Sequence, residues 1–165
     1  MQIFLEKKIG LILKKNELLD NIKKVTIVNE KCKFNKSVSN FINDEKFYEK
    51  ISYCKSKYGK AVLIVGDSHG RDTFNIFAKF SNQKFIIGLN QGGCRPGLKG
   101  CIYQNALKFI KNNKNLIQKL IFTHRGTFFL TKKSEKQNNS KRRLPVNEAQ
   151  FNKTINYVEK LNKIY

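Results

Sequence analysis

The sequence predicts a three-layer α/β/α domain built around a parallel sheet. Three short apolar runs, 60–66, 84–89 and 119–124, are each followed by a segment in which apolar residues recur at helical spacing. Strands that alternate with helices in this way run parallel and are covered by helices on both faces. The first run, "KAVLIVG", is uncharged after its lysine, as in a strand that is buried on both sides.

One helix is predicted before the first strand. Segment 39–57 carries apolar residues near one helical face, and Ser39 or Asn40 is placed to cap its start. We expect Gly59 to end this helix, because glycine tolerates the backbone conformation that follows a helix.

Helices are also predicted after each of the three strands. In segment 71–80 Phe recurs every third residue, and segment 103–116 is amphipathic. The last helix begins near Asn147, and its predicted apolar face consists of Phe151, Ile155, Val158 and Leu161. With this helix the order of elements is strand, helix, strand, helix, strand, helix.

We treat residues 1–30 as an N-terminal extension or linker and residues 31–165 as the domain. The chain contains no run of about twenty apolar residues, the length that a membrane-spanning helix needs. Its first residues are a poor secretory signal, because an acid at position 6 and lysine pairs surround only a short apolar run.

The charge is strongly positive, with 33 Lys and Arg against 12 Asp and Glu, a formal net charge of +21. Such an excess favours an anionic partner. The lysines are spread over most of the chain, however, and no motif of a nucleic-acid-binding domain accompanies them, so nucleic acid is a disfavoured partner. The most concentrated basic cluster, 132–143, lacks apolar residues and is predicted to be an exposed loop that can meet an anion.

Four cysteines, Cys32, Cys54, Cys94 and Cys101, allow three disulfide pairings. The short interval between Cys94 and Cys101 contains Pro and Gly, which allow a tight loop to close. None of the spacings provides the Cys-x-x-Cys pairs of a structural zinc site. Disulfides formed in an oxidising compartment are therefore the favoured interpretation, with four reduced thiols as the alternative.

Ligands of parallel sheets bind at the carboxyl ends of the strands, which here are 66–70, 90–94 and 124–126. The first of these reads "GDSHG". A serine in a strand-to-helix turn has an exposed hydroxyl near the amide N–H groups of the helix start, which can bind an oxyanion. Ser68 is thus a candidate nucleophile, whereas His69 follows it immediately and is badly placed to act as its base.

The same five residues resemble the Asp-x-His-Gly turn of calcineurin-like metallophosphoesterases. That chemistry needs further carboxylates and histidines on later strands. No Asp follows Asp72, no Glu lies between Glu49 and Glu135, and the only other histidine is His124. We therefore expect no metal site and no cofactor.

A more extensive resemblance covers residues 31–165. The ordered motifs "LIVGDSHGRDTF", "GGCRPGLKGC" and "LIFTHRGTFF" resemble those of SGNH, or GDSL-like, hydrolases, in particular the SGNH domain joined to the C-terminal side of membrane-bound bacterial acyltransferases. Cys32 and Cys54 resemble a cysteine pair that precedes the first motif there. The resemblance implies an SGNH/flavodoxin-like fold and a periplasmic or other extracytoplasmic location as part of a membrane protein.

The resemblance also implies roles for individual residues. Ser68 matches the nucleophile, and its backbone N–H matches an oxyanion donor. Asp67 matches a residue that shapes the turn, and Gly92 or Gly93 matches the glycine that contributes a second N–H.

Two further residues are supporting candidates, and both are implied by the resemblance. His69 follows the nucleophile as it does in that branch, and Arg125 matches the arginine of the third motif. The family places its catalytic Asp and His together as Asp-x-x-His on a late loop, but neither residue type occurs after Arg125. We therefore expect a domain that is incomplete at its C-terminus or inactive alone.

Each candidate also has a purely structural explanation. Asp67 and Ser68 are suitable helix-capping residues. His124 at a strand end suits a hydrogen-bonded structural histidine, and Arg125 suits an ion pair with Asp67 or Asp72.

The favoured function is an SGNH-type serine esterase or O-acyltransferase domain that handles acyl groups, foremost acetyl, on a cell-envelope polysaccharide. Its implied partners are the acylated polysaccharide or acyl donor and an N-terminal membrane acyltransferase domain in a longer parent protein. The alternative from another class is a non-catalytic basic domain that binds an anionic glycan or nucleic acid. A metal-dependent phosphoesterase is the third possibility.

Overall fold

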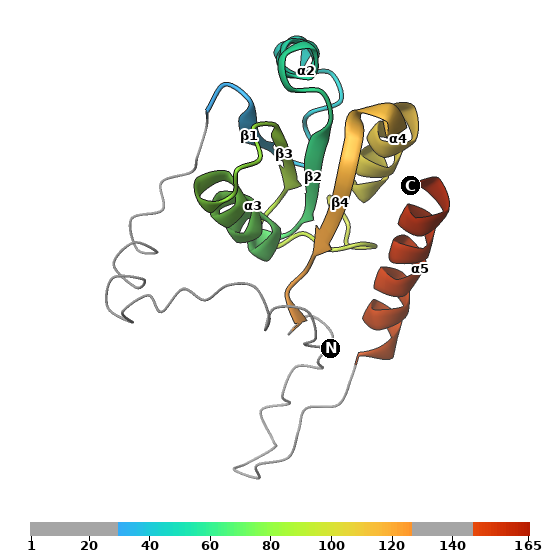
Figure 1. The fold of residues 1–165 in the computed structure, drawn as a ribbon. Helices are drawn as coiled ribbons and strands as arrows, with labels where there is room; N and C mark the ends of the chain where they lie inside the picture. The colour runs from blue at the N-terminus through green and yellow to red at the C-terminus, as the bar shows by residue number, and fades with distance from the viewer. Residues whose placement is uncertain (1–29, 127–146) are drawn as a thin grey trace, which may run out of the picture.

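Four parallel strands form the centre of the molecule in a computed structural model, which describes residues 30–126 and 147–165 (Figure 1). The order across the sheet is β1-β3-β2-β4. The strands are β1 (Lys33–Lys36), β2 (Ala61–Gly66), β3 (Ile86–Asn90) and β4 (Ile117–Thr123). The helices are α2 (Glu45–Tyr58), α3 (Ser68–Phe80), α4 (Tyr103–Asn112) and α5 (Glu148–Ile164), with a 3₁₀ turn at Lys114–Leu116.

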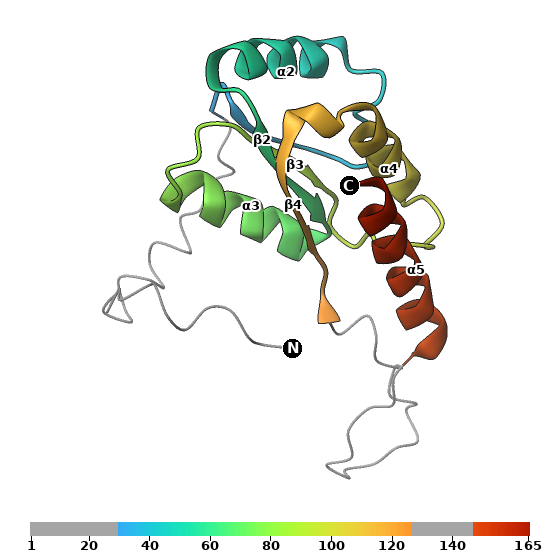
Figure 2. The same ribbon diagram turned by 45° about the vertical axis from the view of Figure 1, so that its right-hand side comes forward.

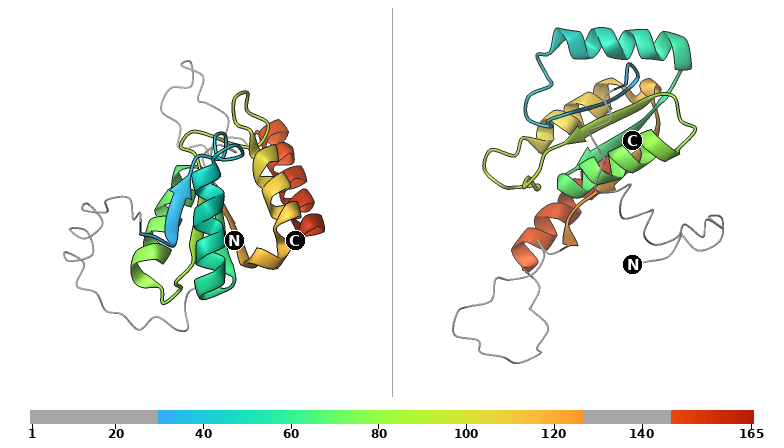
Figure 3. Two further views of the ribbon diagram at one scale, coloured as in Figure 1. Left: turned by 90° about the horizontal axis from the view of Figure 1, so that it is seen from above. Right: turned by 90° about the vertical axis from the view of Figure 1, so that its left-hand side faces the viewer.

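Helices cover both faces of this sheet, which confirms the predicted three-layer class. Helix α3 packs on one face, where Phe74 and Ala78 meet Ile64 of the central strand β2. Helices α2, α4 and α5 cover the other face, where alternate β2 residues such as Leu63 and Val65 enter a larger core. Figures 2 and 3 show the two layers of helices on opposite sides of the strands. All six residues of β2 are buried, because helices cover the strand on both faces. This explains why its sequence is an uninterrupted apolar run.

The short strand β1 was not predicted from the sequence. It has only four residues, "KFNK", and only Phe34 among them is buried. It pairs in parallel with β3, with Lys33 opposite Ile86. A polar edge strand of this length has too few alternations to show a period of two.

The start of the first helix was also misplaced. Helix α2 begins at Glu45, and its N-cap is Asp44, whose carboxylate accepts the N–H of Phe47 at 3.1 Å. Ser39 and Asn40 are therefore not its cap, because the chain makes turns before the helix begins. Gly59 ends α2 with a φ of 75°, as expected.

Helix α5 starts where it was predicted to start, but of its predicted apolar face only Leu161 is buried. Asn147 caps the helix, yet Phe151 and Ile155 are 43% and 39% exposed. The hydrogen bonds of the helix explain this rotation, because Gln150 accepts from Arg95 Nε at 3.1 Å and is satisfied in the interior. The buried residues of α5 are Gln150, Thr154, Tyr157 and Leu161.

Two disulfides bind loops and helices to the sheet. Cys32, just before β1, pairs with Cys54 of α2, and Cys94 pairs with Cys101 to close the loop that follows β3. The predicted pairing of the four cysteines into disulfides is thus confirmed. The predicted basic loop 132–143 lies outside the described residues. Of the helices that the structure describes, none is long and apolar enough to cross a membrane.

Close packing of backbone against backbone predicts a strong effect of one substitution. A Cβ atom on Gly66 would overlap the carbonyl oxygen of Thr123 on β4, whereas a Cβ on Gly92 would meet nothing within 4 Å. We expect Gly66→Ala to lower the free energy of unfolding by about 1–3 kcal/mol, measured by urea denaturation. The matched control Gly92→Ala is expected to change it by less than about 0.5 kcal/mol. Equal effects of the two substitutions would contradict this packing.

Candidate functional site

The three predicted strand ends meet at one edge of the sheet. Gly66 at the end of β2 lies opposite Asn90 of β3 and opposite Thr123 of β4. The segments that follow these residues, "DSHG", "QGGC" and "HRG", are therefore neighbours in space. This edge is the position at which parallel α/β sheets bind ligands.

The Asp67 carboxylate joins two of these segments. The side chain is fully buried, and its Oδ1 accepts the N–H of His69 at 2.9 Å, so that Asp67 is the N-cap of α3. Its Oδ2 accepts the backbone N–H of Arg125 at 2.9 Å. This bond comes from the main chain of Arg125 and is not the ion pair that the sequence suggested for its side chain, which stays a prediction. Both carboxylate oxygens have charge-assisted hydrogen bonds, which offset the cost of burying the charge.

Ser68 is the first residue of α3 and is partly exposed. The N–H groups in the first turn of a helix have no carbonyl partner within the helix, and the helix dipole is positive there. A negatively charged oxygen at the Ser68 hydroxyl would therefore be stabilised. The neighbouring His69 is exposed on α3.

The glycines of "GDSHG" are required by contacts on both sides of the turn. A Cβ on Gly70 would overlap the side-chain oxygen of Asn90, in addition to the clash described above for Gly66. The turn can pass this close to β3 and β4 only without side chains. The glycines of the motif are thus a packing requirement of the turn that carries the candidate residue Ser68.

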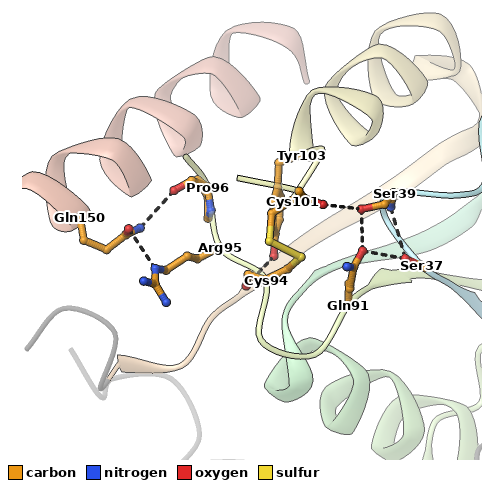
Figure 4. Close-up of a disulfide and its surroundings, with 10 residues drawn as sticks. Ser37, Ser39, Gln91, Cys94, Arg95, Pro96, Cys101, Tyr103 and Gln150 are labelled. Carbon is orange, nitrogen blue, oxygen red and sulfur yellow. Dashed lines mark hydrogen bonds between the residues drawn. A yellow bond between two sulfur atoms is a disulfide. The ribbon is translucent and has the colours of Figure 1, made fainter. Parts of the chain in front are cut away.

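Gly92 and Gly93 lie exposed in the loop after β3, and Gly93 has a φ of 73°. The residue before them fixes this loop to the sheet edge, because Gln91 donates its N–H to the carbonyl of Gly66 at 3.1 Å. The Gln91 side chain also accepts the hydroxyls of Ser37 at 2.7 Å and Ser39 at 2.6 Å (Figure 4). The loop therefore starts at a defined place beside the "GDSHG" turn.

Beyond these glycines, the disulfide loop is bound to α5. Cys94 pairs with Cys101, and the Gln150 amide on α5 donates to the carbonyl of Pro96 at 3.1 Å (Figure 4). Tyr103 donates its hydroxyl to the carbonyl of Cys94 at 3.4 Å. These contacts hold the loop from both ends.

His124 follows β4, and its side chain is only 4% exposed. Its Nδ1 lies 3.8 Å from Oδ2 of Asp67, and its ring stacks on Phe122 with the ring centroids 6.1 Å apart. Burial lowers the pKa of His124, and the negative charge of Asp67 opposes part of this shift. The histidine is thus mainly neutral near pH 7. The sequence did not associate it with an acid, because Asp67 is distant along the chain.

Sequence analysis also missed Asn90, a buried polar residue at this edge. Asn90 is 4% exposed and donates from Nδ2 to the side-chain oxygen of Asn35 at 2.7 Å. Its own Oδ1 has no hydrogen-bond partner in the part of the chain that the structure describes. Buried unsatisfied oxygens are uncommon. The only signal in the sequence was a polar residue at the end of an apolar run.

The metal alternative finds no support in these residues. Within 30–126 and 147–165 no three His, Cys, Asp or Glu side chains lie together in a way that could hold a metal ion. Asp67, which that alternative uses as a ligand, has both oxygens bound to backbone N–H groups.

Comparison with known proteins identifies one family. A family model described as "SGNH domain (fused to AT3 domains)" matches residues 31–165. No curated protein and no solved structure matches the chain.

The burial of His124 predicts a pH dependence of stability. Because its pKa is lowered in the folded state, the unfolded chain binds more protons below about pH 6.5. The stability that the buried, neutral His124 contributes is fully present above this pH. It is lost as the pH falls through the lower, folded-state pKa. We expect His124→Gln to weaken the loss of stability between about pH 7 and about pH 5, measured by urea denaturation.

His69→Gln is the matched control, since it removes the only other histidine of the chain. This variant is expected to keep the pH dependence of the unmodified protein. If the two substitutions alter the pH profile equally, the burial of His124 is not its source.

Proposed function

Since this chain belongs to the family of SGNH domains fused to AT3 domains, we propose that it handles acyl groups through Ser68. The observation that carries the proposal is the turn itself. Ser68 is partly exposed at the start of α3, and the buried Asp67 carboxylate holds that turn through the N–H groups of His69 and Arg125. A nucleophile and an anion-stabilising helix start are thereby placed together.

The proposed reaction is an acyl transfer in two steps. The Ser68 hydroxyl oxygen attacks an ester carbonyl, and the tetrahedral oxyanion is stabilised by N–H groups of the first turn of α3. When the carbon–oxygen bond of the ester breaks, the alcohol leaves with the proton that the serine gave up. Water or a sugar hydroxyl then attacks the acyl-serine, which releases an acid or a new ester and restores the serine.

Such a reaction needs a group that accepts the serine proton. Of the two histidines, His124 lies beside a carboxylate, and its lowered pKa keeps it ready to accept a proton near pH 7. No Asp or His follows Arg125 within these 165 residues, so the Asp-x-x-His pair of the family has no counterpart among them. We therefore propose His124 as the first candidate for the base.

The proposed substrate is an acyl ester, foremost acetyl, on a cell-envelope polysaccharide. This part rests on the family, whose members are fused to AT3 acyltransferase domains. It implies an extracytoplasmic location, a membrane acyltransferase domain as partner in a longer parent protein, and an acylated donor that delivers the group to Ser68. The reaction requires no metal or cofactor.

A second candidate function is the binding of an anionic glycan without turnover. It is supported by the net charge of +21. Binding of this kind would weaken steeply with salt and would be unchanged by Ser68→Ala.

Covalent labelling tests the proposed chemistry. We expect a serine-directed fluorophosphonate to label the full chain at Ser68, detected by mass spectrometry of its peptides, because an activated serine attacks phosphorus as it attacks a carbonyl carbon. Ser68→Ala should abolish the labelling. Ser52→Ala, on the exposed surface of α2, is the matched control and should leave it unchanged.

The same assay tests the base. We expect His124→Gln to slow the labelling of Ser68 at least about tenfold and His69→Gln to leave the rate unchanged. A folded protein that is not labelled at all would overturn the acyl-serine proposal and favour binding without turnover. Labelling that is equally fast in both histidine variants would retain Ser68 but remove His124 from the mechanism.

A further inference from the structure

A pocket lies at the amino ends of the strands, opposite to the end of the sheet that carries Ser68. It has a volume of about 270 Å³ and is formed where the strands begin. One wall comes from the residues around Cys32 at the start of β1, another from the end of α2, and the third from Lys84 before β3. We call it the Lys–Tyr pocket, and its lining residues are Glu30, Lys31, Cys32, Lys33, Tyr53, Lys57, Tyr58 and Lys84.

Two of the four lysines of this pocket are oriented by contacts with their neighbours. The Lys33 side chain is 14% exposed, and its ammonium group donates to the carbonyl of Ala78 at 2.6 Å. The Lys31 ammonium group lies 3.8 Å from the ring centre of Tyr53, within the range of a cation–π contact. These contacts orient Lys33 and Lys31, although Lys31, like Lys57 and Lys84, is exposed at the rim of the pocket.

The lining carries an uncompensated positive charge. It contains four lysines and one acid, Glu30, so its formal charge is 4 − 1 = +3. The Glu30 carboxylate is already paired with Lys33, at 3.5 Å. The same positive surroundings affect Tyr53, since Lys31 and, to a smaller extent, Lys57 lower the pKa of its phenol. An anion that enters the pocket therefore meets a surplus of cations.

A disulfide joins two walls of the pocket. Cys32 lies between Lys31 and Lys33, and its partner Cys54 follows Tyr53 on α2, with the two Cα atoms 5.5 Å apart. The covalent link keeps the lysines of the first wall close to the tyrosine and Lys57 of the second. Binding to groups that are already in position costs less conformational entropy.

We propose that the Lys–Tyr pocket binds the phosphate group of an anionic ligand. A phosphate dianion offers several oxygen acceptors to ammonium and phenol donors that surround it, and lysine binds phosphate as a point charge from any direction. The site lies at the amino ends of β1 and β3 and shares no residue with the turn at Ser68. It is therefore a binding site separate from the proposed acyl-transfer chemistry.

Titration calorimetry of the full chain with inorganic phosphate and with pyrophosphate at low salt tests the proposal. We expect one saturable site, and we expect Lys31→Gln/Lys57→Gln to weaken its affinity at least about tenfold because two charge-assisted contacts are lost. The matched control is Lys108→Gln/Lys111→Gln on the exposed side of α4, which removes the same charge and should weaken binding less than about twofold.

The absence of saturable binding would overturn the proposal, and so would equal losses in the two double variants, because both results would mean a diffuse attraction to a basic protein. Cys32→Ser/Cys54→Ser tests whether the disulfide between the two walls matters for binding. We expect a lower affinity for phosphate in this variant, with circular dichroism showing that the protein is folded. Unchanged labelling of Ser68 in the lysine variants keeps this test independent of the acyl-transfer proposal.

Vesicles distinguish the two sources of such a phosphate group. If it belongs to a lipid headgroup, vesicles that contain phosphatidylglycerol will bind the chain, pyrophosphate will compete, and Lys31→Gln/Lys57→Gln will reduce binding more than the α4 control. If only the soluble anions bind at the pocket, the phosphate belongs to a soluble ligand. Both of these outcomes support a phosphate site at the Lys–Tyr pocket. A loss of vesicle binding that is equal in the two double variants opposes such a site.

Discussion

The two hydrogen bonds of the Asp67 carboxylate join the turn that follows β2 to the segment that follows β4. One oxygen accepts the N–H of His69 inside the turn, and the other accepts the N–H of Arg125 beyond the end of β4. The side chain is fully buried, so losing either bond would leave one carboxylate oxygen in the interior without that hydrogen-bond donor. The position of Ser68 depends on this arrangement, because it is the next residue in the chain and the first of the helix that Asp67 caps.

The buried carboxylate also explains the local environment of His124. The ring is packed against Phe122, which in turn packs against Tyr157 of α5 with ring centroids 5.4 Å apart. An apolar environment of this kind favours the neutral imidazole, while the nearby Asp67 carboxylate favours the charged imidazolium. A histidine balanced between burial and an acid suits proton transfer, and it suits structural packing equally well.

The two ends of the sheet have different electrostatic character. At the carboxyl ends of the strands, a single buried acid lies within a network of amides, hydroxyls and glycines. At the amino ends, lysines surround a pocket beside a disulfide. The strand β2, with six residues, separates these regions by roughly 20 Å. The high net charge of the chain is therefore organised in at least one place, although its composition alone suggested a uniform excess of lysine.

Much of the fold could be predicted from local patterns, because apolar runs, helical spacing and a glycine-bounded turn express the preferences of neighbouring residues. These patterns located β2, β3, β4 and α3 and drew attention to Ser68. They could not locate β1, whose four residues form a strand only beside β3, or the buried face of α5, which depends on the partners of Gln150.

Pairings between distant residues were decided by the tertiary structure. Asp67 meets Arg125 across 58 positions and Asn90 meets Asn35 across 55, because strand order brings the ends of β2, β3 and β4 and the edge strand β1 together. The Lys–Tyr pocket likewise collects residues from three separate segments. Local sequence patterns by themselves indicated the strands β2, β3 and β4 and the Ser68 hydroxyl that follows β2. Only the tertiary structure decided which acid, histidine and cations lie close together, because contact between distant segments depends on the order of strands across the sheet.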